Sequence, residues 1–236
     1  MKLSRLHPWH FWSTESGMTS LLIFTLAYLF VVCALGNFSF GKLVADLLFS
    51  LIIVAGVLTT FKQRWVGFLA IVLAVASLSL TWVNHLRPEG SLIILGTGLD
   101  IIFVGLLLAV LIVQVFGEGA VTPQRIRGAI VVYLLLGGMW SLLYQIAALT
   151  VPHAFRFPEG LAISGPDTLQ RALTYFSYVT LTTTGYGDIT PAAPLTRTLA
   201  MFEALTGQLY VVITLARLVS LAVMGQKDTF YHKSKD

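Results

Sequence analysis

The heptapeptide TTTGYGD, residues 182–188, holds the residues whose types and spacing best suit a chemical role. It lies between two long apolar stretches, where bare backbone and a carboxylate are unexpected. Gly185 and Gly187 can adopt positive φ, and alternating handedness along an extended strip would turn successive carbonyl oxygens to one side. A row of such neutral dipoles is a ligand for a dehydrated monovalent cation. The heptapeptide therefore predicts a cation site built from main-chain oxygens.

The segment before this strip must position it. Residues 168–181, TLQRALTYFSYVTL, are apolar, but at about 1.5 Å per residue they span only about two-thirds of a bilayer core. Asp167 is the predicted N-cap of this short helix. A half-helix that enters the membrane and a strip that leaves it on the same side form a re-entrant loop. The C-terminus of that half-helix carries partial negative charge, which favours a cation nearby. One strip offers one row of oxygens, so several copies must surround a common axis.

The composition predicts a membrane protein around this loop. Of 236 residues, 56% are hydrophobic and only 11% are charged, whereas soluble domains carry charge at roughly a quarter of their positions. We expect an all-α membrane protein with six transmembrane helices, the re-entrant helix and strip lying between helices five and six. The six apolar runs, each close to the ~20 residues that span a bilayer, are 18–35, 43–61, 65–83, 92–116, 126–149 and 195–223.

The distribution of lysine and arginine predicts the orientation. An excess of these residues lies on the side that holds both termini, which predicts that both termini are cytoplasmic in a multi-pass protein of the cell membrane. The residues assigned to that side are Lys2, Arg5, Lys62, Arg64, Arg125, Arg127, Lys227, Lys233 and Lys235. The re-entrant loop then opens to the outside.

Two stretches carry a family resemblance. Residues 172–189 resemble the selectivity filter of tetrameric potassium channels. LTTTGYGDITP and the later EALTGQLYVVITLARLV are similar to bacterial six-transmembrane-helix potassium channels of the pore-loop ion-channel superfamily. The resemblance implies a homotetramer with permeant K⁺ as its only metal ion and Asp188 at the outer mouth. The K⁺-binding residues that it implies are Thr183, Thr184, Gly185, Tyr186 and Gly187.

The sequence departs from the family pattern around the filter. Thr184 replaces the usual valine or isoleucine and adds a hydroxyl group that needs a partner. Tyr175 and Phe176, the expected filter supports, stand where many relatives carry tryptophan. Because Phe176 cannot donate a hydrogen bond, we expect Thr180 to be the partner of Tyr186. Gly207 falls where the family often places a hinge in the inner helix, so it is the predicted gating hinge.

The resemblance divides the chain into three parts. Residues 1–120 would form a four-helix transmembrane bundle, similar to a voltage sensor in helix number. Residues 121–225 would form the pore domain, and residues 226–236 a short cytoplasmic tail. A voltage sensor needs several arginines, because one charge yields only about 2.3 kcal/mol per 100 mV. The run 92–116 contains no arginine, which predicts weak voltage dependence.

The roles of four charged residues in the apolar runs can be interpreted in more than one way. Asp46 lies near a helix end, which favours capping, while Asp100 suits a buried hydrogen bond and a proton or ligand sensor equally well. Glu203 and Arg217 are too far apart to pair within one helix. We expect Glu203 at the back of the pore and Arg217 near the cytoplasmic end, both with structural or gating roles.

These observations predict passive, potassium-selective conduction. A less selective monovalent cation channel stays open because of Thr184, and so does a non-conducting membrane signalling or assembly subunit with a channel fold. We find no nucleophile–base constellation or phosphate-binding motif, so we expect no enzyme activity and no cofactor. The expected partners are K⁺, membrane lipids and further copies of the chain, without nucleic acid. A separate regulatory subunit and the gating stimulus are left open.

Overall fold

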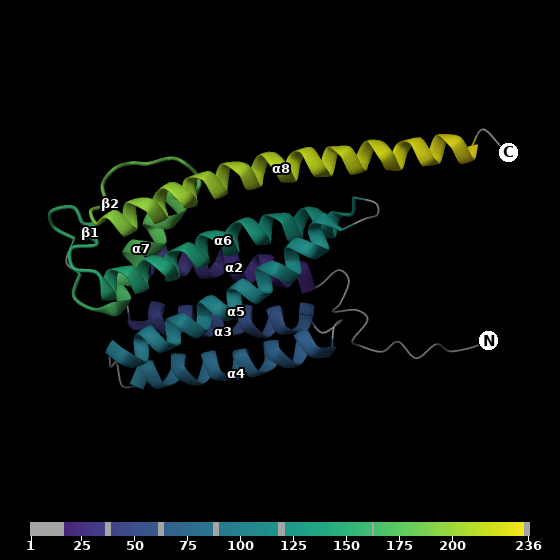
Figure 1. Cartoon of the computed structure of the whole chain (residues 1–236). Coiled ribbons are helices and arrows are strands. Elements are labelled where there is room, and N and C mark those ends of the chain that lie inside the picture. Colours follow the sequence, from purple (N-terminus) through teal and green to yellow (C-terminus); the bar gives the residue numbers. More distant parts are fainter. Residues whose placement is uncertain are drawn as a thin grey trace.

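The computed structural model describes residues 17–35, 39–60, 64–86, 90–117, 121–161 and 163–233. These residues contain seven helices and two short strands (Figure 1). The elements are α2 (Gly17–Ala34), α3 (Ser39–Thr60), α4 (Arg64–Leu86), α5 (Gly90–Phe116), α6 (Pro123–Thr150), β1 (Phe155–Arg156), α7 (Pro166–Leu181), β2 (Thr190–Pro191) and α8 (Pro194–Lys233).

Five of these helices are long and apolar enough to cross a bilayer: α2, α4, α5, α6 and α8. Helix α3 has 22 residues but contributes only a shorter apolar stretch, Leu43–Leu58. By length and composition, the described residues therefore support a membrane protein with five clear candidate spans. The second of the six predicted runs is helical, but its crossing of the membrane stays a prediction.

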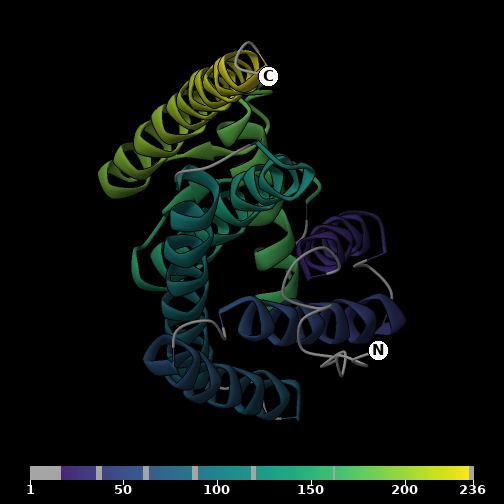
Figure 2. The ribbon, with the colours of Figure 1, turned by 90° about the vertical axis from the view of Figure 1, so that its right-hand side faces the viewer.

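The first four helices form one bundle, in which α2 and α5 pack against the same chain's α6. Helix α5 lies along α6, α2 contacts both α6 and α3, and α4 joins α3 to α5 (Figure 2). Leu21, Ile53, Leu107 and Val131 lie in this interface and are almost completely buried. A second apolar cluster, which includes Tyr144, lies between α6, β1 and α7. The two clusters give α6 a bundle-facing side and a side that holds α7.

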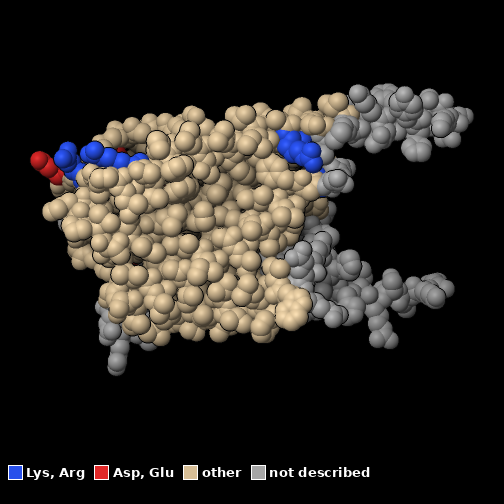
Figure 3. Space-filling view, viewed as in Figure 1, with Lys and Arg blue, Asp and Glu red and all other residues tan. Residues whose placement is uncertain are grey.

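The contacts define two ends of the molecule. At one end the Arg127 guanidinium donates to the Thr19 hydroxyl at 2.8 Å, so α6 and α2 begin side by side. The Arg217 guanidinium donates to the Phe116 carbonyl at 3.4 Å, which brings the later part of α8 to this same end. The opposite end holds β1 and β2. On the face drawn in Figure 3, the Lys and Arg side chains of the described residues gather near the two ends, and uncharged residues lie between them.

The predicted boundary between pore domain and tail, at residue 225, falls inside a helix. Helix α8 continues without a break to Lys233, so the segment predicted as a tail from residue 226 begins as a helical extension. A strongly helical run has no reason to end at the membrane surface when no proline or cap stops it. Residues 1–16, 61–63 and 234–236, which carry Lys2, Arg5, Lys62 and Lys235 of the orientation argument, lie outside the described residues.

Candidate functional site

Helix α7 is held between α6 and α8 and leads directly to the TTTGYGD strip. It begins at Pro166, with Gly165 as its N-cap, and the Gly165 N–H donates to the Thr168 hydroxyl oxygen at 3.0 Å. The prediction that Asp167 is the N-cap is therefore wrong. Pro166 explains the difference, because its fixed φ suits the first helical position and moves the cap two residues earlier, to Gly165. Asp167 lies in the first turn, where the helix dipole stabilises a carboxylate.

The C-terminal end of α7 meets α6 well inside the length of that helix. The Tyr178 hydroxyl donates to the Leu134 carbonyl at 2.6 Å. The Tyr133 hydroxyl donates to the Leu181 carbonyl at 3.3 Å. Residues 133 and 134 lie about 15 Å along α6 from its start at Pro123, whereas α7 begins near the other end of α6. The chain after Leu181 therefore starts near the middle of the helix layer.

The strip that follows alternates in backbone handedness. Thr183, Gly185 and Gly187 have φ of 57°, 59° and 78°. Glycine adopts this conformation at no steric cost, whereas threonine at a positive φ is unusual and marks a tightly fixed backbone. The positive φ expected at Gly185 and Gly187 is present. Thr183, which sequence reasoning did not single out for its backbone, extends the alternation to the inner end of the strip.

The amide groups of the strip are fixed by the last turn of α7. The Thr183 N–H donates to the Thr180 carbonyl at 2.9 Å, and the Thr184 N–H donates to the Val179 carbonyl at 2.9 Å. The Gly185 N–H reaches the same Val179 oxygen at 3.3 Å. These bonds satisfy carbonyls that a helix C-terminus leaves open. They also point three consecutive N–H groups towards α7, which fixes the strip on the helix that precedes it.

Residues 182–188 are all exposed on the single chain, although they lie between apolar helices. Tyr186 is 72% exposed, and a Cβ built at Gly185 or Gly187 would meet no atom within 4 Å. The predicted bond between Thr180 and Tyr186 is not tested within one chain and stays a prediction. An open strip with satisfied amides has its carbonyl oxygens available to a ligand or to a symmetry-related copy.

The extra hydroxyl of Thr184 has a partner in the chain itself. Its Oγ1 lies 2.9 Å from Oγ1 of Thr182. Thr182 in turn donates to the Tyr178 carbonyl at 2.7 Å, so the hydrogen between the two threonines belongs to Thr184. The two side chains form a short ladder from the strip to α7. Thr182 was not among the predicted site residues, because only the fold brings these two hydroxyl groups together.

The outer end of the strip contacts the rest of the chain at several points. Asp188 accepts a hydrogen bond from the Tyr175 hydroxyl of α7. Ile189 is buried in the cluster around Phe155. β1 then pairs antiparallel with β2, with Phe155 opposite Pro191. The strip therefore has a fixed exit as well as a fixed entry.

Phe176 packs behind α7 rather than against the strip. Its ring lies 5.1 Å from that of Tyr144 and 5.3 Å from that of Phe155, both in edge-on contacts. Such aromatic pairs add about 0.5–1.5 kcal/mol beyond the area that they bury. Tyr175 and Phe176, predicted together as supports, thus face different surroundings: Tyr175 contacts the mouth, and Phe176 anchors the helix to α6 and β1.

Gly207 allows α8 to touch the end of α7. A Cβ at this position would lie 2.1 Å from the Leu181 carbonyl oxygen, a distance at which one of the two backbones must move. Helix α8 shows no break here. The structure therefore supplies a packing reason for this glycine at the junction of helix and strip, while its role as a hinge stays a prediction.

Comparison with known proteins finds a family similarity for this part of the chain. Residues 165–224 match the family model described as ion channel. The match begins at the N-cap of α7, includes the whole strip and ends within α8, so it covers the site and leaves the first four helices outside it. It supports a pore-loop ion channel. No curated protein and no solved structure matches the chain.

Glu203 of α8 lies against α6 and α7, and sequence reasoning missed its partners there; its expected place at the back of a pore stays a prediction. It is 0% exposed. Its Oε1 lies 2.5 Å from the Ser177 hydroxyl of α7, and its Oε2 accepts from the Tyr144 hydroxyl of α6 at 2.5 Å. Sequence reasoning could have flagged Ser177 as a small polar residue in an apolar helix. The pairing itself joins three helices and follows only from their packing.

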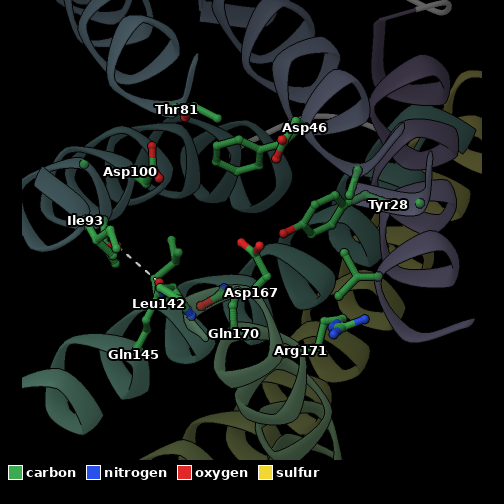
Figure 4. A pocket seen from close by; sticks show the side chains of 17 residues that line it. Tyr28, Asp46, Thr81, Ile93, Asp100, Leu142, Gln145, Asp167, Gln170 and Arg171 are labelled. Carbon is green, nitrogen blue, oxygen red and sulfur yellow. Dashed lines mark hydrogen bonds between the residues drawn. The ribbon is translucent and has the colours of Figure 1, made fainter. Parts of the chain in front are cut away.

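A half-buried carboxyl group, that of Asp100, lines a cavity in the first half of the chain. Asp100 of α5 accepts a hydrogen bond from Ser77 of α4 and faces a cavity of about 290 Å³. Figure 4 shows Asp100 on one side of this cavity and Asp167 and Tyr28 towards the other. Asp46 also lines it, so its role is not confined to a helix end. No group of three His, Cys, Asp or Glu residues in the described parts of the chain could hold a metal ion.

Proposed function

We propose that this chain is one subunit of a homotetrameric potassium channel. Six helices cross the membrane, and α7 with the strip forms a re-entrant loop that enters from the outside and returns there. Four strips around the axis exchange carbonyl oxygens for the water of a permeant K⁺. The single observation that carries the proposal is the strip itself: alternating backbone at Thr183, Gly185 and Gly187, with its amides bound to α7 and its opposite side open.

The exposure of α8 supports assembly. Only 17% of its candidate span is buried within the chain, against 56% for α6. Large apolar side chains such as Phe202, Leu209 and Val212 are more than half exposed. Further copies of the chain would cover part of this surface, and the rest would line the pathway below the strip. The same arrangement would bring four exposed strips to a common axis.

The first four helices have no arginine-based voltage sensor in this proposal. Helix α5 occupies the fourth position and contains Asp100 but no lysine or arginine. Moving a single charge through 100 mV supplies only about 2.3 kcal/mol. We therefore expect a shallow conductance–voltage relation. A steep relation that requires several gating charges per subunit would contradict this part of the proposal.

A flux assay on the purified protein in liposomes tests the function. We expect K⁺ flux that falls strongly when Na⁺ replaces K⁺, and no flux from Gly185→Asp, because aspartate places a charged side chain on a strained backbone in the pathway. Gly160→Asp, at a positive-φ glycine in the loop before α7, is the matched control and should conduct. Undiminished flux in Gly185→Asp would place the pathway elsewhere.

The same assay separates two alternatives. A less selective cation channel, favoured by the hydroxyl of Thr184 in the strip, would pass Na⁺ and K⁺ at similar rates. A non-conducting subunit would pass neither ion although it assembles. Reversal potentials in opposed potassium and sodium gradients give the selectivity directly.

A further inference from the structure

Three helices of the proposed pore meet at one buried polar cluster. Glu203 of α8, Ser177 of α7 and Tyr144 of α6 are each 0% exposed. They make no contact with the cavity that surrounds Asp100. Tyr144 also packs edge-on against Phe176 and Phe155, so apolar rings enclose the carboxyl group on the α6 side. A fully enclosed group must find all of its hydrogen-bond partners within the protein.

The contacts in this cluster require more hydrogens than the two hydroxyl groups supply. The Ser177 oxygen lies 2.8 Å from the Gly137 carbonyl and 2.5 Å from Oε1 of Glu203. The Gly137 carbonyl can only accept, and so can Oε1 of an ionised glutamate, so with Glu203 ionised the single hydrogen of Ser177 would have to serve both oxygens. The Tyr144 hydrogen is directed to Oε2. The contact between Ser177 and Oε1 then needs a third hydrogen, and a carboxylic acid at Glu203 is its source.

The charges around the cluster favour the same protonation. The titratable groups that face Glu203 are the neutral tyrosines 133, 144 and 178, which lie on α6 and α7. Among described side chains, the nearest arginines along α7 and α8 are Arg171 and Arg197. Each lies six positions, or about 9 Å of helix, from Ser177 or Glu203. Both carboxyl oxygens are held by hydroxyl groups instead of a cation. An unpaired ionised carboxylate would be costly in such a place.

The cluster is placed to control the strip. Ser177 lies on the last turns of α7, two residues before Val179, whose carbonyl holds the amides of Thr184 and Gly185. On the α8 side, Glu203 lies one turn before Gly207, where α8 touches the Leu181 carbonyl. A shift of Glu203 would therefore change how α7 sits on both neighbours and move the hydrogen bonds that fix the strip.

We propose that Glu203 is a positioning residue of the filter, held as a neutral acid that donates to Ser177 while Ser177 donates to Gly137. Tyr144 completes the cluster by donating to the other carboxyl oxygen. This arrangement fixes the rotation and depth of α7 between α6 and α8, and thereby the strip. The inference rests on the proposed function, because its effect is measured as selectivity for K⁺ over Na⁺.

Glutamine distinguishes a neutral acid from a carboxylate. Its amide offers one group that donates to Ser177 and one oxygen that accepts from Tyr144, so Glu203→Gln reproduces the neutral pattern. We expect Glu203→Gln to keep the ratio of K⁺ to Na⁺ flux within about twofold of the native protein, and Glu203→Ala to lower it about tenfold, the equivalent of one buried hydrogen-bond loss. Glu159→Gln, on the exposed loop before α7, is the matched control and should have no effect.

Two further measurements keep the test independent of folding and of conduction. The infrared difference between native protein and Glu203→Gln should contain the carbonyl band of a protonated carboxylic acid at neutral pH, and no such band should appear for Glu159→Gln. On raising the pH, the native flux ratio should fall as Glu203 ionises, whereas that of Glu203→Gln should stay constant.

The outcomes are distinguishable. Absence of the infrared band, or equal damage from glutamine and alanine, would overturn the neutral acid. A native flux ratio in Glu203→Ala would overturn the positioning role. If the native protein itself passes no K⁺, the proposed function fails and the positioning role fails with it, while the infrared band still decides the protonation of Glu203.

Discussion

Two carboxyl groups on membrane-length helices have similar first contacts and opposite surroundings. Glu203 on α8 and Asp100 on α5 are each bonded to a serine of a neighbouring helix, Ser177 and Ser77 respectively. Glu203 is enclosed completely, and both of its oxygens have protein partners. Asp100 lines a cavity of about 290 Å³ together with other polar side chains. The serine contact alone therefore does not determine how a buried acid behaves.

The difference lies in whether water can replace a lost partner. A polar cavity of this size can hold several waters that satisfy a carboxyl oxygen. The enclosed cluster around Glu203 leaves no such replacement, so its geometry depends on every protein partner being present. We infer that the pore half of the chain is intolerant of small changes and that the bundle half is permissive. Three sets of substitutions test this contrast.

The largest effect is expected from Gly207→Ala. The new Cβ would lie 2.1 Å from the Leu181 carbonyl oxygen, so the junction of α7 and α8 must open. Overpacking of this kind costs about 1–3 kcal/mol, and here it also displaces the filter. We expect loss of K⁺ flux and a lower melting temperature of the purified protein.

Gly98→Ala and Gly105→Ala are the controls for that change. A Cβ at either position on α5 would meet nothing within 4 Å. Alanine also favours helix over glycine by up to about 1 kcal/mol. Both variants should melt at the native temperature or above and conduct normally. If Gly207→Ala behaves like them, the close packing of the pore half is not required.

The sequence was most informative where a residue type itself determines the backbone conformation. The two glycines of TTTGYGD predicted positive φ at positions 185 and 187. The lengths of the apolar runs predicted where the long helices begin to within a few residues. Helix ends were less predictable: Pro166 moved the start of α7, and α8 ran past residue 225 because nothing in the sequence stops it. These boundaries depend on single residues whose competing preferences are similar in energy.

The contacts between distant segments could not be predicted. Glu203 was expected behind the pore, but its bond to Tyr144 joins residues 59 positions apart, and a single sequence does not encode which hydroxyl a carboxyl group will meet. The same holds for Asp100, whose serine partner and cavity depend on the packing of α4 and α5. Periodicity gives a helix its apolar faces, but it does not fix the rotation of one helix against another.

An intermediate effect is expected when one hydroxyl group is removed from each carboxyl cluster. Tyr144→Phe keeps the ring and leaves Oε2 of Glu203 without its donor, at a cost of about 1–3 kcal/mol in the free energy of unfolding. Ser77→Ala removes the donor to Asp100, but water in the cavity can replace it, so the cost should stay below about 1 kcal/mol. Thermal unfolding of the two variants, measured in the same detergent, gives the comparison directly. Equal destabilisation would mean that the cavity does not solvate Asp100.

The smallest effect is expected from Thr184→Val, although the residue belongs to the strip. Valine keeps the β-branched shape and removes only the hydroxyl that donates to Thr182. Thr182 still donates to the Tyr178 carbonyl, so no donor loses its acceptor. Both threonines are exposed on the single chain, and the change in stability should stay within about 0.5 kcal/mol.

The flux ratio of Thr184→Val decides what that hydroxyl does. If main-chain carbonyls bind the ion, the hydroxyl is not a ligand, and the ratio of K⁺ to Na⁺ flux should change by less than about twofold, equivalent to roughly 0.4 kcal/mol. A rise of about tenfold would mean that the native hydroxyl relaxes selectivity, which favours the less selective cation channel. Because the substitution leaves the backbone bonds of residues 183–185 in place, either result separates the side chain from the main chain as the source of selectivity.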